Sequence, residues 1–357
     1  MRVTKQTWTA TVSAVLFVVL AAVIALLPVP YVTWSPGGTH DLLGQVTGTD
    51  GNSVAAITVS GPEVTTHPTN GQLRMTTVAV TSPDSTLSLP EVLFSYWLPS
   101  REVLPRTAVY RPGEESTEIA DQESRLMADS QSTAVVAALR QAGIEVQSWP
   151  MVSSVSNSGA AIGILQPGDL IKAVDGRPTR TLAEVQAAIS RLDVGDDVEF
   201  LILRDGVQSR MKVTTRSTAT DPDRPVVGIS LDVGYSYDAT VSFAIDPAIG
   251  GSSAGLMFAL AINDMLTEAD LAAGRSIAGS GTMAADGTVG PIGGVQEKVA
   301  AAARDGATIF LLPRSNCADV GAVAAGIRLV SVETLAEAVE SLGALNQPAK
   351  AASVKGC

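Results

Sequence analysis

Ser253 is the residue of this chain best placed to act as a nucleophile. It lies in the run Gly250-Gly251-Ser252-Ser253-Ala254-Gly255, after the alternating segment 239–245 and before the apolar segment 256–262. Alternation predicts a strand, and an uninterrupted apolar run predicts a buried helix. The first amides of such a helix have no internal partner and point outward, which suits a negatively charged oxygen. Because a serine hydroxyl alone is a poor nucleophile, the site also needs a base.

The best candidate for that base is Lys298. The chain has two histidines, His40 and His67, and nothing in their surroundings favours a Ser-His-Asp arrangement. Wound as a helix, the segment after Gly293-Gly294 places four residues on one stripe: Val295, Lys298, Val299 and Ala302. A cation on an apolar face loses hydration, so the pKa of the Lys298 amine should fall toward neutrality. A neutral amine can accept the proton of a serine hydroxyl.

These two segments resemble the proteolytic domain of Lon-type serine peptidases. Ser253-Ala254-Gly255 at the start of an apolar helix and Pro291-Ile292-Gly293-Gly294-Val295-Gln296-Glu297-Lys298 carry the resemblance, which covers residues 224–342. The resemblance implies that Ser253 is the nucleophile, that Lys298 is the base, and that Ser280 is the hydroxyl residue near the lysine amine. It also implies a homo-oligomer, because ring formation is common in the family.

Two positions depart from the family pattern. Ser252 stands where the family usually has proline, and Gly250 stands where some members have an acidic residue. A third, acidic participant is therefore unassigned, and Asp246 is a weak candidate for it. A purely structural interpretation of both motifs also stays open, since glycine and serine commonly cap helices and a lysine on an apolar stripe can extend its amine to solvent.

The amino-terminal region contains a segment long and apolar enough to cross a membrane. No charged residue occurs between Lys5 and Asp41, and Trp8–Leu27 is almost wholly apolar. As a helix this stretch is about 30 Å long, which matches the hydrocarbon core of a bilayer. Arg2 and Lys5 precede it, so the positive-inside rule places everything after Pro28 outside the cytoplasm. A cleaved signal peptide is the rival interpretation, disfavoured because its apolar region is normally shorter and no clear cleavage site follows.

Composition narrows the choice of partners. The 357 residues carry a formal net charge of −12, which argues against a nucleic-acid partner. The length predicts two or three domains. No Walker A sequence and no metal-ligand signature are present, so we expect no cofactor and no ATP-driven motor. Cys317 and Cys357 suit an oxidising compartment, and a disulfide between them is a hypothesis.

Two regions lie between the apolar segment and residue 224. Residues 35–143 are typical of a β-rich region followed by a helix, and they contain no recognisable chemistry. Residues 145–216 contain a strand between two turns, a capping box at Thr181-Leu182-Ala183-Glu184 and a hairpin signal at Asp205-Gly206. This order resembles a bacterial PDZ domain, a fold that binds an extended peptide by adding it as a strand beside a helix.

We therefore expect an α+β multidomain protein. Its expected parts are a cytoplasmic stub (1–7), a transmembrane helix (8–29), a β-rich region followed by a helical segment (35–143), a PDZ domain (145–216), a Lon-type proteolytic domain (224–342) and a carboxyl-terminal tail (343–357). The expected function is ATP-independent cleavage of unfolded or exposed peptide segments by a Ser-Lys serine endopeptidase outside the cytoplasmic membrane. The alternative is a membrane-anchored PDZ adaptor that binds peptides and whose Lon-like domain is catalytically silent.

Overall fold

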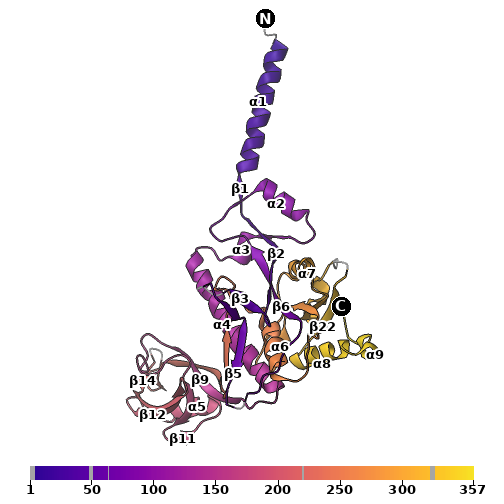
Figure 1. The fold of residues 1–357 in the computed structure, drawn as a ribbon. Coiled ribbons are helices and arrows are strands. Elements are labelled where there is room, and N and C mark those ends of the chain that lie inside the picture. The colour runs from indigo at the N-terminus through magenta and orange to yellow at the C-terminus, as the bar shows by residue number, and fades with distance from the viewer. Residues whose placement is uncertain (1–4, 48–50, 63, 219–220, 322–325) are drawn as a thin grey trace. The chain divides into compact units, whose positions relative to one another are not determined.

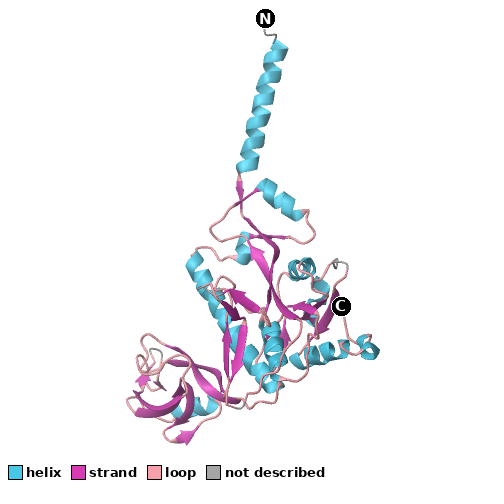
Figure 2. Ribbon diagram, in the orientation of Figure 1, coloured by secondary structure: helices cyan, strands magenta, loops and turns pink. Residues whose placement is uncertain are grey.

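The computed structural model describes residues 5–47, 51–62, 64–218, 221–321 and 326–357. They form two compact units, shown in Figure 1. The first unit joins residues 1–143 to residues 239–357, and the second unit is residues 144–238. Helices and strands are mixed in both (Figure 2), so the expected α+β class is confirmed.

A six-stranded sheet organises the first unit. Its strands, in spatial order, are β22 (Arg328–Val332), β21 (Ile309–Pro313), β18 (Ser276–Gly279), β6 (Gln72–Val80), β2 (Tyr31–Asp41) and β8 (Glu102–Pro105). The four strands from β22 to β6 are parallel, whereas β2 and β8 run antiparallel to their neighbours. The parallel strands β18 and β21 are almost entirely buried, as expected for strands covered on both faces.

The helices of the first unit include one that is buried on all sides. This is α6 (Gly255–Leu266), whose apolar run cannot present any face to water. It packs against β6 and against α4 (Ser116–Gln141) and α8 (Leu335–Leu345). Helix α7 (Val295–Arg304) packs on β2 and β6. The sheet and these helices form the core that positions the residues discussed below.

Shorter elements complete the first unit. They are β1 (Pro28–Val29), β3 (Gln45–Thr47), β4 (Ser53–Ala55), β5 (Ile57–Ser60), β7 (Leu87–Ser88), α2 (Leu89–Tyr96), α3 (Arg106–Val109), β17 (Thr240–Phe243), β19 (Thr282–Met283), β20 (Val289–Gly290), the 3-10 helix η1 (Arg314–Asp319) and α9 (Pro348–Ala351). They pair as β1 with β7, β3 with β4, β5 with β17 and β19 with β20. The strand predicted for 239–245 is thus β17.

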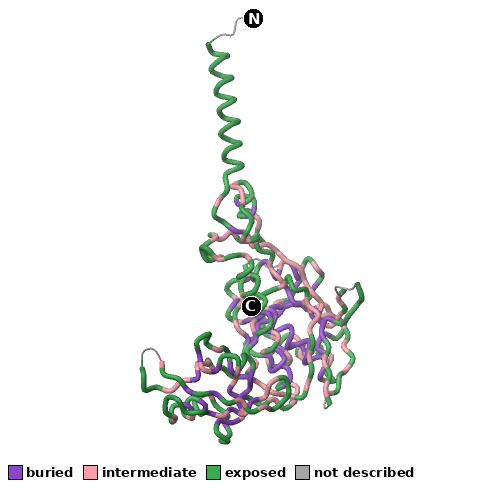
Figure 3. The backbone as a smooth tube through the Cα atoms, turned by 90° about the vertical axis from the view of Figure 1, so that its left-hand side faces the viewer, coloured by how far each residue is buried: buried purple, intermediate pink, exposed green. Residues whose placement is uncertain are grey.

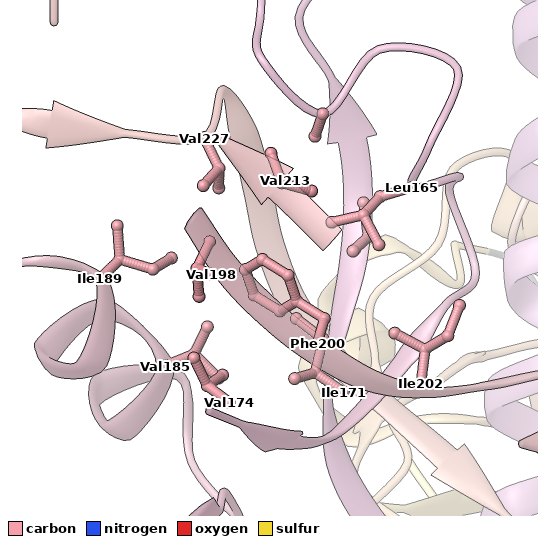
Figure 4. Close-up of a cluster of buried hydrophobic side chains, with 12 residues drawn as sticks. Leu165, Ile171, Val174, Val185, Ile189, Val198, Phe200, Ile202, Val213 and Val227 are labelled. Atoms are coloured by element: carbon pink, nitrogen blue, oxygen red, sulfur yellow. The ribbon is translucent and has the colours of Figure 1, made fainter. Parts of the chain in front are cut away.

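The second unit is a sheet with one helix against it. The sheet order is β13 (Val207–Thr214), β12 (Asp197–Arg204), β10 (Leu170–Val174), β9 (Gln147–Val155) and β16 (Ile229–Ser236), with β11 (Arg177–Pro178) also paired to β10 and a separate pair β14 (Arg216–Ser217) and β15 (Pro225–Val226). Figure 4 shows its core, in which Phe200 packs among aliphatic side chains from the sheet and from α5 (Leu182–Ile189). The capping box predicted at Thr181 and Glu184 starts α5.

The division of the chain differs from the expected one in two places. Residues 35–143 were expected to stand apart from the protease segment, yet β2, β6 and β8 lie in the same sheet as β18, β21 and β22. Residues 224–238 were expected in the protease segment, yet β16 pairs with β9 in the second unit. In both places strands that are distant in sequence satisfy their backbone hydrogen bonds in a shared sheet, parallel for β6 with β18 and antiparallel for β16 with β9.

Helix α1 (Lys5–Leu26) covers most of the predicted membrane span. Every residue of α1 is exposed (Figure 3), although most are apolar. By length and composition it can cross a bilayer, and in the described part of the chain it is the one helix that can. A signal sequence near an amino terminus has the same features, so the helix alone does not distinguish the two.

A disulfide fastens the carboxyl terminus. Cys317 in η1 is bonded to Cys357, with 5.2 Å between their Cα atoms. The tail also lies against β22, where the Ser331 amide donates to the Lys355 carbonyl oxygen at 3.2 Å. The pairing that the sequence left as a hypothesis is therefore present, and it ties the tail to the edge of the central sheet.

We predict that removing this disulfide destabilises the first unit. The bond closes a loop of 40 residues, and the chain-entropy relation gives about 4 kcal/mol for a loop of that size. The free energy of unfolding, measured by urea denaturation, should fall by this order on reduction of the wild type. Reduction should leave the Cys317→Ser/Cys357→Ser double variant unchanged. Equal stability of oxidised and reduced wild type would contradict the prediction.

Candidate active site

The loop before α6 presents Ser253 at the start of a buried helix. Gly251 has φ +91°, a conformation that side-chain-bearing residues rarely adopt, and its amide donates to the Glu123 carbonyl oxygen at 3.0 Å. Gly255 begins the helix where a Cβ would come within 2.8 Å of the Met283 Cβ. The glycines on either side of Ser253 therefore allow a tight turn and a close helix contact, which together fix the serine.

Lys298 lies on the buried face of α7. Gly294, with φ +66°, directly precedes the helix, and the apolar stripe predicted from the sequence is buried in the structure. Lys298 itself is only 4% exposed. Its side chain therefore points into the protein, and the alternative in which the amine reaches solvent does not apply.

Two serine hydroxyls meet at the Lys298 amine. Nζ lies 2.9 Å from Ser253 Oγ and 3.1 Å from Ser280 Oγ. The fully buried Ser280 hydroxyl donates to the Ser253 carbonyl oxygen at 2.9 Å. Because its one proton is used there, Ser280 Oγ can only accept from Lys298. This polarity turns an N–H of the amine toward Ser280 and leaves the lone pair of a neutral amine free to face Ser253.

The electrostatic surroundings favour the neutral amine. Burial lowers the pKa of Lys298 to about 8, and the nearby Glu297 carboxylate acts in the opposite direction. Among the described residues no carboxylate forms an ion pair or hydrogen bond with Nζ. An uncompensated ammonium is costly at this depth, so the unprotonated form becomes the main one above about pH 8, well below the ordinary lysine range.

Backbone hydrogen bonds hold the two serine segments together. The Gly281 amide donates to the Ser253 carbonyl oxygen at 2.8 Å, and the Leu256 amide donates to the Gly281 carbonyl oxygen at 3.0 Å. From the other side, the Ser130 hydroxyl of α4 donates to the Ser252 carbonyl oxygen at 3.0 Å. The position of Ser253 thus depends on α4 and on the segment after β18, both distant in sequence.

A cavity of about 630 Å³ opens beside Ser253 and Lys298. Its walls come from β6, from one face of α4, and from the loop that carries residues 247–254. Most lining side chains are apolar, and Glu123 on α4 is the exposed carboxylate among them. A Cβ on Gly251 would lie 3.1 Å from Glu123 Oε2, so this carboxylate reaches the loop just before Ser253.

The structure brings together Ser253, Lys298 and Ser280, the three residues predicted for the site. Asp246 is exposed, and its carboxylate accepts from the Ala248 amide at 2.9 Å within its own turn. The contribution of residues 75–80 and of α4 was not predicted, because residues 35–143 were expected to contain no recognisable chemistry. Their helix and strand patterns were visible, but no local motif marks them, because they reach the site only through the shared sheet.

Comparison with known proteins supports both expected domains. Residues 246–343 match the Lon protease (S16) C-terminal proteolytic domain, and residues 132–215 match the PDZ domain. Lon protease 2 of Bacillus subtilis (strain 168) is 25% identical over 48% of this chain and 32% of its own length. The periplasmic pH-dependent serine endoprotease DegQ of Escherichia coli (strain K12) is 29% identical over 31% of this chain and 26% of its own length.

Two further similarities are shorter. The magnetosome formation protease MamE of Paramagnetospirillum magneticum is 40% identical over 18% of this chain and 9% of its own length. The PDZ domain of an SdrC-like protein from Listeria monocytogenes is 25% identical, with a TM-score of 0.22, over 23% of this chain and 86% of that domain. The chain thus spans a third or less of the curated relatives named here. It is a protein that combines a PDZ domain with a Lon-type protease domain.

We predict that Lys298 costs stability in a pH-dependent way. Below pH 8 the folded protein holds a buried ammonium, and between about pH 8 and 10.5 the folded amine has lost its proton while the unfolded one keeps it. Stability of the wild type should therefore rise with pH in this window. Lys298→Met should raise the free energy of unfolding by about 1–3 kcal/mol at pH 7, and the gain should shrink toward pH 10. Parallel pH profiles of the two proteins in chemical denaturation would refute this.

Proposed function

We propose that this protein is an ATP-independent serine endopeptidase with a Ser-Lys dyad. One observation carries the proposal: an almost fully buried lysine amine, with no carboxylate partner among the described residues, lies 2.9 Å from the hydroxyl of a serine that borders a cavity. The match of residues 246–343 to the Lon proteolytic domain supports the same conclusion. The absence of a Walker A sequence in the printed chain supports independence from ATP.

The reaction follows from the hydrogen-bond geometry. Neutral Lys298 removes the proton of Ser253 as Oγ attacks the peptide carbonyl, and an N–H to Ser280 keeps the amine oriented. The resulting ammonium gives its proton to the leaving amine. Water, deprotonated by the same lysine, then attacks the acyl-enzyme, and the ammonium returns that proton to Ser253 Oγ as the ester bond breaks. In each step the positive charge is on the Lys298 amine. Because that amine is buried, it readily gives the proton up and becomes neutral again.

Backbone amides before α6 are suited to hold the oxyanion. The Leu256 amide is already bonded to the Gly281 carbonyl oxygen, and the Met257 and Phe258 amides both donate to Ala254. We therefore assign the oxyanion contacts to the amides of Ser253 and Ala254. These amides precede the helix and lie at the positive end of its dipole.

The cavity favours an extended peptide as substrate. Strand β18 pairs with β6 only over residues 72–75, so in the described part of the chain residues 76–80 have a strand partner on the β2 side alone. Four of these residues line the cavity: Thr76, Thr77, Val78 and Val80. A peptide can add as a strand along such an edge, which requires an unfolded or exposed segment rather than a folded domain.

The remaining parts fit a protease that works outside the cytoplasm. We propose that α1 is an uncleaved membrane anchor, with the two units on the extracytoplasmic side, where the disulfide would persist. The PDZ domain would present peptide segments. A homo-oligomer stays an expectation from the Lon resemblance.

The adaptor alternative is disfavoured by the same lysine. A scaffold has no need for a buried amine aligned on a serine, and a well-packed apolar residue would be less costly there. The two functions are separated by the experiment below.

Our first functional prediction concerns the dyad. Ser253→Ala and Lys298→Met should each reduce cleavage of an unfolded protein to background, whereas the wild-type rate should rise through about pH 8 as Lys298 deprotonates. Lys172→Met is a matched control, because the pKa of Lys172 is also lowered to about 8 but this residue lies in the second unit. It should keep the same profile. Equal cleavage by wild type, Ser253→Ala and Lys298→Met would exclude the Ser-Lys dyad and favour the adaptor function.

Our second functional prediction concerns substrate charge. Glu123 is the exposed carboxylate in an otherwise largely apolar cavity, so the enzyme should favour peptides with arginine or lysine near the scissile bond. Glu123→Lys should lower kcat/KM for such peptides by about 10-fold, the equivalent of 1.4 kcal/mol, and should improve cleavage of acidic ones. Glu118→Gln changes an exposed carboxylate of α4 outside the cavity and should have no effect. Unchanged charge preference in Glu123→Lys would remove Glu123 from substrate selection.

A further inference from the structure

Helix α2 turns its apolar side chains outward. Leu93, Phe94, Tyr96 and Trp97 are 44%, 60%, 73% and 76% exposed, whereas its buried positions are Val92 and Ser95. At about 100° per residue the four exposed side chains share one arc of the helix surface. A water-soluble surface rarely gathers large apolar groups in this way, and such a patch usually marks an interaction site.

The helix does not depend on burying these side chains in the protein. Its start is fixed by a capping box, in which the Ser88 amide and hydroxyl both donate to the Glu91 carboxylate at 2.7 and 2.8 Å. Pro90 occupies the first turn, where its missing N–H costs nothing. The outward face is therefore available for another environment.

The chain itself places this face next to the end of the membrane helix. Strand β1 starts two residues after Leu26, and Pro28 pairs with Ser88, the residue that caps α2. Paired strands lie about 4.8 Å apart, so α2 begins within one strand spacing of the point where the chain leaves α1. Helices α1 and α2 are also in contact, and Figure 1 shows α2 beside the end of α1.

We propose that the outward face of α2 lies in the interfacial layer of the bilayer that α1 spans. This inference rests on the proposed anchor. A helix of 22 residues is about 33 Å long and crosses the hydrocarbon core, so Pro28 and the start of α2 lie at the level of the lipid headgroups. Tyrosine and tryptophan are enriched at that level, because their rings are apolar and their O–H or N–H groups can bond to water and headgroups.

A basic residue beside α2 is compatible with a lipid surface as the occupant. The exposed Arg101 follows α2 closely, and an arginine near an apolar helix can reach anionic headgroups. A helix held in this way is an interfacial helix, and it gives the first unit a second attachment to the membrane besides α1.

The test measures where single positions of the full chain lie in liposomes. Because Cys317 and Cys357 are bonded to each other, an introduced cysteine is the reactive thiol for a nitroxide label. We choose Phe94→Cys on α2, Val19→Cys in α1, and Asp121→Cys on the exposed face of α4. Accessibility to oxygen, which enters lipid, and to a water-soluble nickel chelate then reports the depth of each label.

Position 94 should show severalfold lower nickel accessibility than position 121 and a shallower depth than position 19. Water-like accessibility at 94 with a deep label at 19 would overturn the proposal but keep the anchor. Low accessibility at 94 to both reagents would mean that protein covers α2, and it would also overturn the proposal. A water-like label at 19 would overturn the anchor and the proposal together.

A second variant avoids the new thiol. Lipids brominated near the headgroup should quench the fluorescence of Trp97. The wild type should therefore lose more tryptophan fluorescence in such liposomes than Trp97→Phe does. Quenching equal in wild type and Trp97→Phe would contradict the proposal, whatever the labelled variants show.

Discussion

The proposed chemistry depends on one buried amine that has no carboxylate partner among the described residues. Burial alone lowers the pKa of Lys298 to about 8, and the Ser280 hydroxyl, committed as a donor to Ser253, fixes which way the amine faces. An ion pair at the same place would keep the lysine charged and inert as a base. The surrounding structure keeps the amine buried and in contact with the serine. Helix α7 holds Lys298 inside the protein, and α4, α6 and the segment after β18 hold Ser253 against it.

The site is a product of the whole first unit. Residues 246–343 alone match the Lon proteolytic domain, yet β6 and α4, which precede the second unit in the chain, supply two walls of the cavity. The second unit, residues 144–238, is inserted between the two halves of the first. The insertion leaves the central sheet intact, because the strands of that sheet come from the chain segments before and after the second unit.

Much of this could be predicted from the sequence where the signal was local. The serine turn, the stripe that buries Lys298, the capping box of α5 and the hairpin after β12 all follow from patterns shorter than a dozen residues. The division into units could not be predicted, because the parallel pairing of β6 with β18 joins residues about 200 apart and leaves no local trace. For the same reason Glu123 and residues 76–80 were not recognised as parts of the cavity. The outward face of α2 was equally hidden, since a short apolar helix does not show which side it buries.

The most direct test is the titration of the Lys298 amine itself. In protein labelled with ¹³C at the lysine Cε, we expect a resonance that titrates near pH 8, disappears in Lys298→Met and persists in Lys172→Met, in which the second lysine with a pKa lowered to about 8 is removed. If the resonance lost in Lys298→Met titrates near the ordinary lysine value of about 10.4, the amine stays charged through pH 8 and cannot act as the proposed base.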